Sequence, residues 1–391
     1  MLNTSLSPWP SFTQEEADAV SKVLLSNKVN YWTGTECREF EKEFAAFAGT
    51  QYAVALSNGT LALDVALKAM GIGAGDDVIV TSRTFLASAS CIVTAGANPV
   101  FADVDLNSQN ISAETIKAAL TPNTKAIIVV HLAGMPAEMD SIMDLAKEHD
   151  LWVIEDCAQA HGAKYKGKSV GSIGHVGAWS FCQDKIMTTG GEGGMVTTND
   201  KELWRKMWSY KDHGKSYDAV YHREHAPGFR WLHESFGTNW RMMEMQAVIG
   251  RIQLKRMPEW TARRQAHAAK LAESLGKFAG IRLIEVADYI EHAQYKFYAF
   301  VKPEHLKEGW TRDRIVSELN ARKVPCYQGS CSEVYLEKAF DNTPWRPKER
   351  LKNAIQLGDT SLMFLVHPTL TDDEIAFCKE HIEAVLAEAT A

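Results

Sequence analysis

The stretch AIIVVHLAGMPAEMDSIMDLAKEHDLWVIEDC (126–157) decides the fold. Its two ends are apolar runs with few polar interruptions, and an amphipathic segment of about ten residues lies between them, which is typical of two buried strands joined by a helix. The same alternation continues towards the N-terminus, with apolar runs at 52–57, 77–80 and 99–104 and amphipathic segments at 60–70, 85–95 and 112–120. Buried strands alternating with helices predict a mostly parallel sheet flanked by helices on both faces, so the fold class is α/β.

The C-terminal half has a different pattern. Glycine-rich turns separate short strands at 178–181 and 195–198, and a helical stretch runs from Arg241 to about Lys277, with a break expected near Pro258. The remaining segments predict a smaller α+β lobe, with strands at 282–286 and 295–302 and helices near 311–321 and 372–387.

Length, charge and cysteine content restrict the kind of protein that this sequence can encode. A chain of 391 residues usually exceeds one hydrophobic core, so we predict a large α/β domain at 1–250 and a small α+β domain at 251–391. Its 49 acidic against 42 basic residues disfavour nucleic acid as a partner. The seven scattered cysteines form no C-x-x-C pair, which predicts no metal site and suits the reducing cytoplasm. No apolar stretch is long enough to cross a membrane.

Two segments have features of an anion site. SNGT (57–60) places a glycine turn between a strand and a helix, where the free N–H groups and the helix dipole favour phosphate, although Ser57 or Asn58 could simply cap the helix. GAKYKGKS (162–169) matches the letters of a P-loop. Three glycines follow it where that motif needs a helix, so a hairpin or loop is predicted there, and nucleotide hydrolysis is excluded.

Acidic and basic side chains stand at two further strand ends. Glu155 and Asp156 end the strand at 151–157; because neighbouring side chains point to opposite faces, one of them should face a ligand while the other forms a salt bridge or a helix cap. Lys185 follows the next strand and precedes a glycine-rich turn, which suits a Schiff-base lysine, although most lysines are solvated. An anion turn, a strand-end acid and such a lysine are together the parts of a pyridoxal 5'-phosphate site.

Six segments, in order, resemble the DegT/StrS group of pyridoxal-phosphate-dependent sugar aminotransferases of fold type I. They are SNGTLAL (57–63), TFLASA (84–89), HLAGMPAEMD (131–140), IEDCAQAHGA (154–163), SFCQDKIMTTGGEGGMV (180–196) and GTNWRMMEMQAVIGRIQLKRM (237–257). The resemblance covers about residues 10–260 and is looser beyond them.

The resemblance implies a role for individual residues. Lys185 would hold the cofactor as a Schiff base, and Asp156 would pair with the pyridine nitrogen. Gln159 would bind on the side of the phenolic oxygen, and Phe85 would lie against the ring. The phosphate would be held by Gly59, Thr60 and Ser180, and by Asn239 from the other subunit of a homodimer, close to Arg241.

The resemblance also implies the reaction. We expect an amino group to move from glutamate to a keto carbon of a nucleotide-linked deoxy sugar, with the 4-keto position ranked above the 3-keto position, in aminosugar and polysaccharide biosynthesis. A cyclitol ketone is an alternative acceptor, and a non-catalytic regulatory protein of the same fold is a remote one. The chain departs from the family at Cys331, where a histidine is common, and in the aromatic segment 213–236. In that segment His222, His225 and His233 could contact the substrate, although solvated or core histidines are the more common case. Candidates for binding a diphosphate are Lys215, Arg223 and Arg230.

Overall fold

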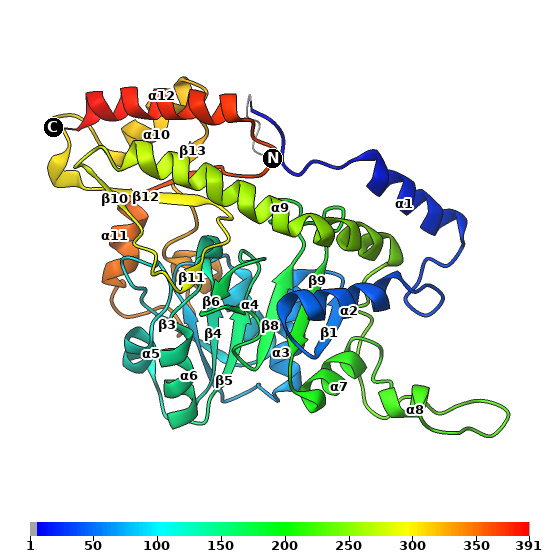
Figure 1. The fold of residues 1–391 in the computed structure, drawn as a ribbon. Coiled ribbons are helices and arrows are strands. Elements are labelled where there is room, and N and C mark those ends of the chain that lie inside the picture. The colour runs from blue at the N-terminus through cyan, green and yellow to red at the C-terminus, as the bar shows by residue number, and fades with distance from the viewer. Residues whose placement is uncertain (1–5, 391) are drawn as a thin grey trace.

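The computed structural model describes residues 6–390, which form two lobes (Figure 1). The lower lobe is built on a seven-stranded sheet in which only β9 runs antiparallel to its neighbours. In spatial order the strands are β1 (Tyr52–Leu56), β9 (Gly194–Thr198), β8 (Val176–Ser180), β5 (Trp152–Asp156), β4 (Thr124–Val130), β2 (Asp77–Thr81) and β3 (Asn98–Ala102). The predicted mostly parallel sheet is therefore confirmed.

Helices cover both faces of this sheet, because alternate residues of each strand enter different cores. On β4, Ala126 and Ile128 belong to one buried cluster, whereas Ile127 and Val129 belong to another. The helices of this lobe are α2 (Glu36–Ala48), α3 (Gly59–Ala69), α4 (Ala87–Thr94), α5 (Ala113–Ala119), α6 (Met139–Glu148) and α7 (Lys201–Tyr210). The carboxyl ends of the parallel strands consequently lie together at one edge of the sheet, where ligands bind in such folds.

The upper lobe contains an antiparallel sheet with its own apolar core. Its strands, in spatial order, are β10 (Ile281–Leu283), β12 (Phe297–Val301), β14 (Ser361–Phe364) and β13 (Cys326–Tyr327). Its helices are α10 (Arg312–Ala321), α11 (Lys352–Thr360) and α12 (Asp372–Ala389). Single 3-10 turns are found at Leu132–Gly134, Pro303–His305, Val334–Leu336 and Lys338–Phe340.

One long helix, α9 (Glu244–Leu275), joins the lobes and contradicts the predicted break, because it runs without interruption through Pro258. Proline removes one backbone hydrogen bond and crowds the carbonyl of Leu254. This local cost is offset because α9 packs along its length against α1 (Gln14–Leu25), α2 and α12. The predicted boundary at Gly250 lies inside α9, and the division into domains stays a prediction.

The P-loop-like segment forms the predicted hairpin. Strands β6 (Lys164–Tyr165) and β7 (Lys168–Ser169) pair antiparallel around a turn in which Lys166 and Gly167 both have positive φ. The short strand β11 (Ile290–Glu291) adds to β6 and so ties the second half of the chain to the first. No helix begins at the Lys-Ser end, so the segment cannot wrap a phosphate in the manner of a P-loop.

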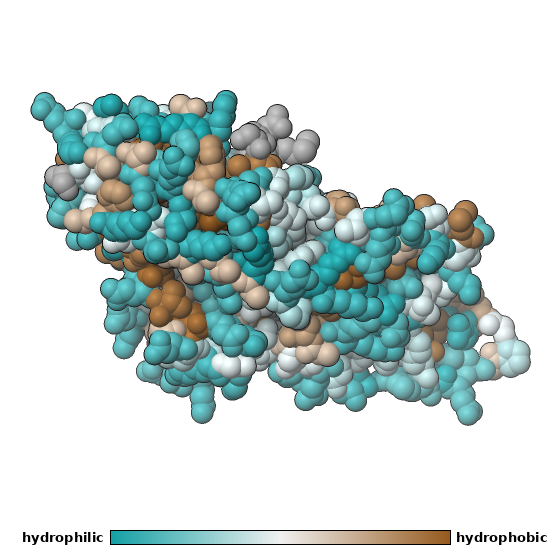
Figure 2. Space-filling view, turned by 45° about the horizontal axis from the view of Figure 1, so that its top comes forward, coloured by the Kyte–Doolittle hydropathy of each residue, from teal (hydrophilic) through white to brown (hydrophobic). Residues whose placement is uncertain are grey.

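Residues 217–236, which we call the arm, project beyond the body of the lower lobe (Figure 1). The arm begins with α8 (Tyr217–Tyr221) and carries three aromatic side chains with large exposed fractions: Phe229 at 77%, Trp231 at 81% and Phe236 at 99%. By contrast, the face of the body visible in Figure 2 is mostly hydrophilic, with apolar residues in small patches. Within the described residues, no helix combines the length and apolar character that a membrane crossing needs.

Candidate active site

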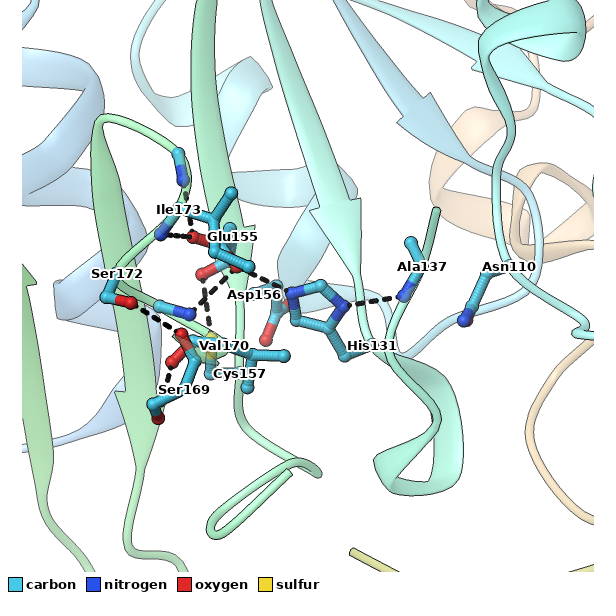
Figure 3. A network of polar contacts seen from close by, with 12 residues as sticks. Asn110, His131, Ala137, Glu155, Asp156, Cys157, Ser169, Val170, Ser172 and Ile173 are labelled. Carbon is cyan, nitrogen blue, oxygen red and sulfur yellow. Dashed lines mark hydrogen bonds and ion pairs between the residues drawn. The ribbon is translucent and has the colours of Figure 1, made fainter. Parts of the chain in front are cut away.

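The two acids at the end of β5 have different surroundings. Glu155 is fully buried and accepts hydrogen bonds from the ring of His131 (2.9 Å) and from the backbone N–H groups of Gly171 (2.8 Å), Ile173 (2.9 Å) and Gly174 (2.6 Å) (Figure 3). Burial alone would raise the pKa of Glu155, but these donors lower it below the usual 4.5. Four internal donors satisfy this carboxylate, so it has a structural role.

Asp156 keeps acceptor capacity for a ligand. It is 6% exposed and accepts one bond on each oxygen, from the Ser88 hydroxyl (2.7 Å) and from the Ala158 N–H (3.1 Å). A carboxylate has about four lone-pair sites, so a further donor can be bound. Burial raises the pKa of Asp156, and the bond from Ser88 opposes that rise. The Asp156 carboxylate can therefore bind a cationic donor of a ligand, because the protein does not fill all of its acceptor positions.

The predicted anion turn lies close to Ser180. Asn58 does cap α3, accepting the N–H of Leu61 (3.0 Å), yet the first N–H groups of the helix still lack an intrahelical acceptor. Gly59 is required here, because a Cβ at this position would lie 2.5 Å from the Cβ of Ser180. This close approach brings the Ser180 hydroxyl beside the helix start, while Thr60 is exposed in the first turn. Hydroxyls, N–H groups and the dipole together form a site for a phosphate.

Lys185 is not a solvated surface lysine. Its side chain is 17% exposed, and its Nζ lies 4.0 Å from Asp184 and 5.2 Å from the ring centroid of Tyr295. Its backbone is fixed as well, since the indole of Trp9 donates to the Lys185 carbonyl (2.9 Å). The structure therefore holds the amine near the strand ends, and its charge acts on Asp156.

Gln159 and Phe85 complete the group around Asp156. The side-chain oxygen of Gln159 accepts the N–H of Ala133 (2.8 Å), which leaves its amide N–H groups to donate to a ligand. Phe85 is 71% exposed although it follows the buried Thr84, so its ring is free to cover a flat ligand. We call Gly59, Asp156, Gln159, Ser180 and Lys185 the strand-end site.

Asn239 is not connected to the strand-end site by a side-chain contact. It is exposed, and its side chain makes no hydrogen bond to another described residue, although the next residue, Trp240, accepts the N–H of Ser57. Its neighbour Arg241 is held in an ion pair with Asp212 (2.6 Å). The predicted role of Asn239 in a second subunit stays a prediction.

Of the candidate substrate residues in the second half of the chain, some lie near the strand ends and others do not. The carbonyl of Cys331 accepts the N–H of Thr84 (3.1 Å), so this loop of the upper lobe reaches the strand ends. Two of the candidate basic side chains are already in ion pairs, Lys215 with Asp212 and Arg223 with Glu234. Arg230 has no ion pair among the described residues, and His222, His225 and His233 lie along the arm without a contact to the strand-end site.

Sequence reasoning missed Trp9, Asp184 and Tyr295. Tyr295 donates to Asp184 (2.5 Å) across 111 positions of the chain, and Trp9 reaches Lys185 across 176. Asp184 could have been noticed because it precedes Lys185, but no pattern marked the other two.

The residues at the strand ends fit pyridoxal 5'-phosphate. The donors at Gly59 and Ser180 suit its phosphate, the unfilled acceptor positions of Asp156 suit a protonated ring nitrogen, and the uncovered Phe85 suits its ring face. Lys185 supplies the amine that such a cofactor requires.

Comparison with known proteins gives matches over nearly the whole chain. A model of the DegT/DnrJ/EryC1/StrS aminotransferase family matches residues 10–383. A GDP-perosamine synthase of Escherichia coli O157:H7 is 42% identical over 377 residues, which cover 95% of this chain and 96% of that protein. A UDP-N-acetyl-3-dehydro-alpha-D-glucosamine 3-aminotransferase of Acidithiobacillus ferrooxidans is 42% identical over 363 residues, 91% of this chain and 90% of that protein. The solved structure of an aminotransferase from Psychrobacter cryohalolentis is 65% identical, covers 98% of this chain and 99% of its own, and superposes with a TM-score of 0.97.

Proposed function

Because the chain belongs to the DegT/DnrJ/EryC1/StrS aminotransferase family, we propose that it moves an amino group from glutamate to a keto carbon of a nucleotide-linked deoxy sugar. Membership confirms the predicted resemblance and the fold type I architecture, and makes the protein a sugar aminotransferase dependent on pyridoxal 5'-phosphate. The donor, the acceptor position and the subunit arrangement are the proposed part.

The observation that carries the proposal is the strand-end site. When bound, pyridoxal 5'-phosphate supplies an electron sink for the carbon that exchanges its amino group. Asp156 would keep a proton on the ring nitrogen, and Gly59, Thr60 and Ser180 would bind the phosphate. Lys185 would hold the cofactor covalently until the amino donor displaces it, and its freed amine would then be placed to move a proton at the reacting carbon, a role for which its restricted position is suited.

For the acceptor, we keep the 4-keto position first and the 3-keto position second. The family resemblance favours the former, whereas the Acidithiobacillus ferrooxidans relative is named for a 3-dehydro substrate and supports the latter. A cyclitol ketone is the third candidate. A non-catalytic regulatory role is disfavoured by the presence of both Lys185 and Asp156. We place the reaction in the cytoplasm and assign it to polysaccharide biosynthesis.

The acceptor is tested by incubating the loaded protein with glutamate and a panel of nucleotide-linked 4-keto sugars, 3-keto sugars and a cyclitol ketone. Mass spectrometry of the products then measures the exchange of a carbonyl oxygen for an amino group. An aminated 4-keto sugar supports the first choice, and amination of another panel member alone replaces it. A protein that forms no product and does not bind the cofactor would favour the regulatory role.

We further propose that the enzyme is a homodimer with shared active sites. Large exposed aromatic side chains need covering, and three of them lie on the projecting arm, three to ten residues before Asn239. Asn239 would extend from one subunit to the phosphate held by Gly59 and Ser180 of the other.

Mixing two inactive variants tests this arrangement. Lys185→Ala should lose the absorbance of lysine-bound cofactor and the reaction with glutamate, and Asn239→Ala should bind the phosphate weakly. If the two variants are unfolded together in equal amounts and refolded, half of the dimers contain one subunit of each kind. Each mixed dimer has one intact site of its two, so about a quarter of the wild-type activity should return. A mixture no more active than its components contradicts a shared site.

A further inference from the structure

Lys296 is a cation without a partner beside Lys185. Its Nζ lies 4.8 Å from the ring centroid of Tyr295, and the Nζ of Lys185 lies 5.2 Å from the same centroid, so the two nitrogens are at most about 10 Å apart. Lys296 is only partly exposed, and among residues 6–390 no hydrogen bond or ion pair engages its ammonium group. A half-buried ammonium that the protein does not pair is placed to bind an anionic ligand.

The charges around Tyr295 are not balanced. Asp184 is the nearby carboxylate, and it already accepts the Tyr295 hydroxyl (2.5 Å) and lies 4.0 Å from Lys185. Arg264 adds a third cation: it is 1% exposed, donates to the Tyr295 carbonyl (3.3 Å), and its Nε and Nη2 have no acceptor among the described residues. Lys185 also acts on Asp156, whereas Lys296 and Arg264 form no ion pair with a carboxylate among the described residues.

The surroundings of Lys296 lower its pKa. Burial lowers this pKa to about 8, Asp184 partly opposes the shift, and the charges of Arg264 and Lys185 lower it further. The group still carries its charge at neutral pH. An anion next to it would remove the electrostatic cost of holding a third cation there.

Lys296 lies near the strand-end site, because its ammonium and that of Lys185 both lie close to the ring of Tyr295. It directly precedes β12, the strand that carries Tyr298. The hydroxyl of Tyr298 accepts the N–H of Ser330 (2.9 Å), and the next residue, Cys331, contacts Thr84 through its carbonyl. The strand that follows Lys296 is thus linked, through the loop at Ser330 and Cys331, to the turn that carries Phe85.

We propose that Lys296 binds a carboxylate of the amino donor, which is a dicarboxylic amino acid. This inference rests on the proposed function and assigns its donor site. Both carboxylates of such a donor lie within about 6 Å of its nitrogen, which reacts at the position that Lys185 serves. An ammonium on a flexible four-carbon side chain, at most about 10 Å from Lys185, is therefore within range of one of them. The diphosphate of the acceptor is separated from the reacting carbon by the sugar ring.

Binding of glutarate, which has two carboxylates and no amine, gives a readout independent of catalysis. Isothermal titration of the cofactor-loaded enzyme should show glutarate binding that weakens about 10- to 100-fold in Lys296→Met and is largely retained in Lys296→Arg. Lys302→Met, on a partly exposed lysine just beyond the far end of β12, is the matched control and should bind normally. Unchanged binding in Lys296→Met overturns the proposal.

The two half-reactions separate the possible anions. In Lys296→Met the glutamate concentration that gives half-maximal rate in the first half-reaction should rise about 10- to 100-fold. The keto-sugar concentration that gives half-maximal rate in the second half-reaction should stay constant. A rise for the sugar alone would mean that Lys296 binds the diphosphate, and would overturn the proposal. If the wild type does not react with glutamate but binds glutarate through Lys296, the carboxylate site stands and only the proposed donor fails. If it binds no glutarate either, the site is refuted.

Discussion

Glu155 and Asp156 are adjacent carboxylates on one buried strand, yet their surroundings differ. The pocket of Glu155 supplies four internal donors, which are three backbone N–H groups of the loop 171–174 and the ring of His131. The pocket of Asp156 supplies two, from Ser88 and Ala158. The pKa values follow this difference, being lowered for Glu155 and raised for Asp156 although both are buried.

The comparison teaches that a count of internal donors distinguishes a structural charge from a functional one. A fully bonded carboxylate stabilises the loop that surrounds it and has nothing left for a ligand. A partly bonded carboxylate costs free energy until a ligand completes its bonds, and it is found at the strand ends where ligands bind. Three substitutions test this distinction.

The largest effect is expected for Asp156→Asn. The fold should persist, since the amide fits the same space, but the ring nitrogen of the cofactor would lose its anionic partner. We expect the rate of the half-reaction with glutamate to fall about 10²- to 10⁴-fold, measured by single-turnover absorbance. Thermal unfolding should change little, and Asp144→Asn on the exposed side of α6 is the control. A fully active variant would mean that Asp156 does not serve the cofactor.

Glu155→Gln should instead lower stability. Its amide nitrogen would face N–H donors that now lack an acceptor, so we expect the free energy of unfolding to fall by about 3–5 kcal/mol in urea titrations. Because the folded pKa of Glu155 lies below 4.5, its contribution is complete above pH 4.5 and is lost as the pH falls through the folded value. The difference between wild type and variant should therefore shrink in acid. Glu148→Gln, at an exposed position, is the control and should leave the free energy of unfolding unchanged. If Glu155→Gln lowers this free energy no more than the control does, Glu155 has no structural role.

Ser88→Ala should have the smallest effect. The Ser88 hydroxyl stabilises the ionised form of Asp156, so its removal raises the pKa of that carboxyl further. Activity needs ionised Asp156, so it is lost as the pH is lowered through the pKa of this carboxyl. In the variant the acidic limb of the rate profile should therefore lie about one pH unit higher. Ser90→Ala, two residues along α4, should leave the profile in place. An unshifted acidic limb in Ser88→Ala would show that this bond does not tune Asp156.

The order of strands and helices in the lower lobe could be predicted because it depends on local patterns. Apolar runs at 126–132 and 151–157 became β4 and β5, and the segment 140–149 became α6, with ends shifted by one or two residues. The continuity of α9 through Pro258 could not be predicted in this way. It depends on packing against three helices that are distant in sequence, and this packing outweighs a local propensity.

The sequence by itself determined the elements of the large sheet, the strand-end position of the two acids, the anion turn and the lysine. It also determined that Glu155 and Asp156 face opposite ways, because side chains alternate along a strand. Only the tertiary structure decided which acid is fully bonded, and that Trp9, Tyr295 and Lys296 surround Lys185. The physical reason is distance along the chain: Trp9 and Tyr295 lie more than a hundred positions from the residues they contact, and no local pattern records such contacts.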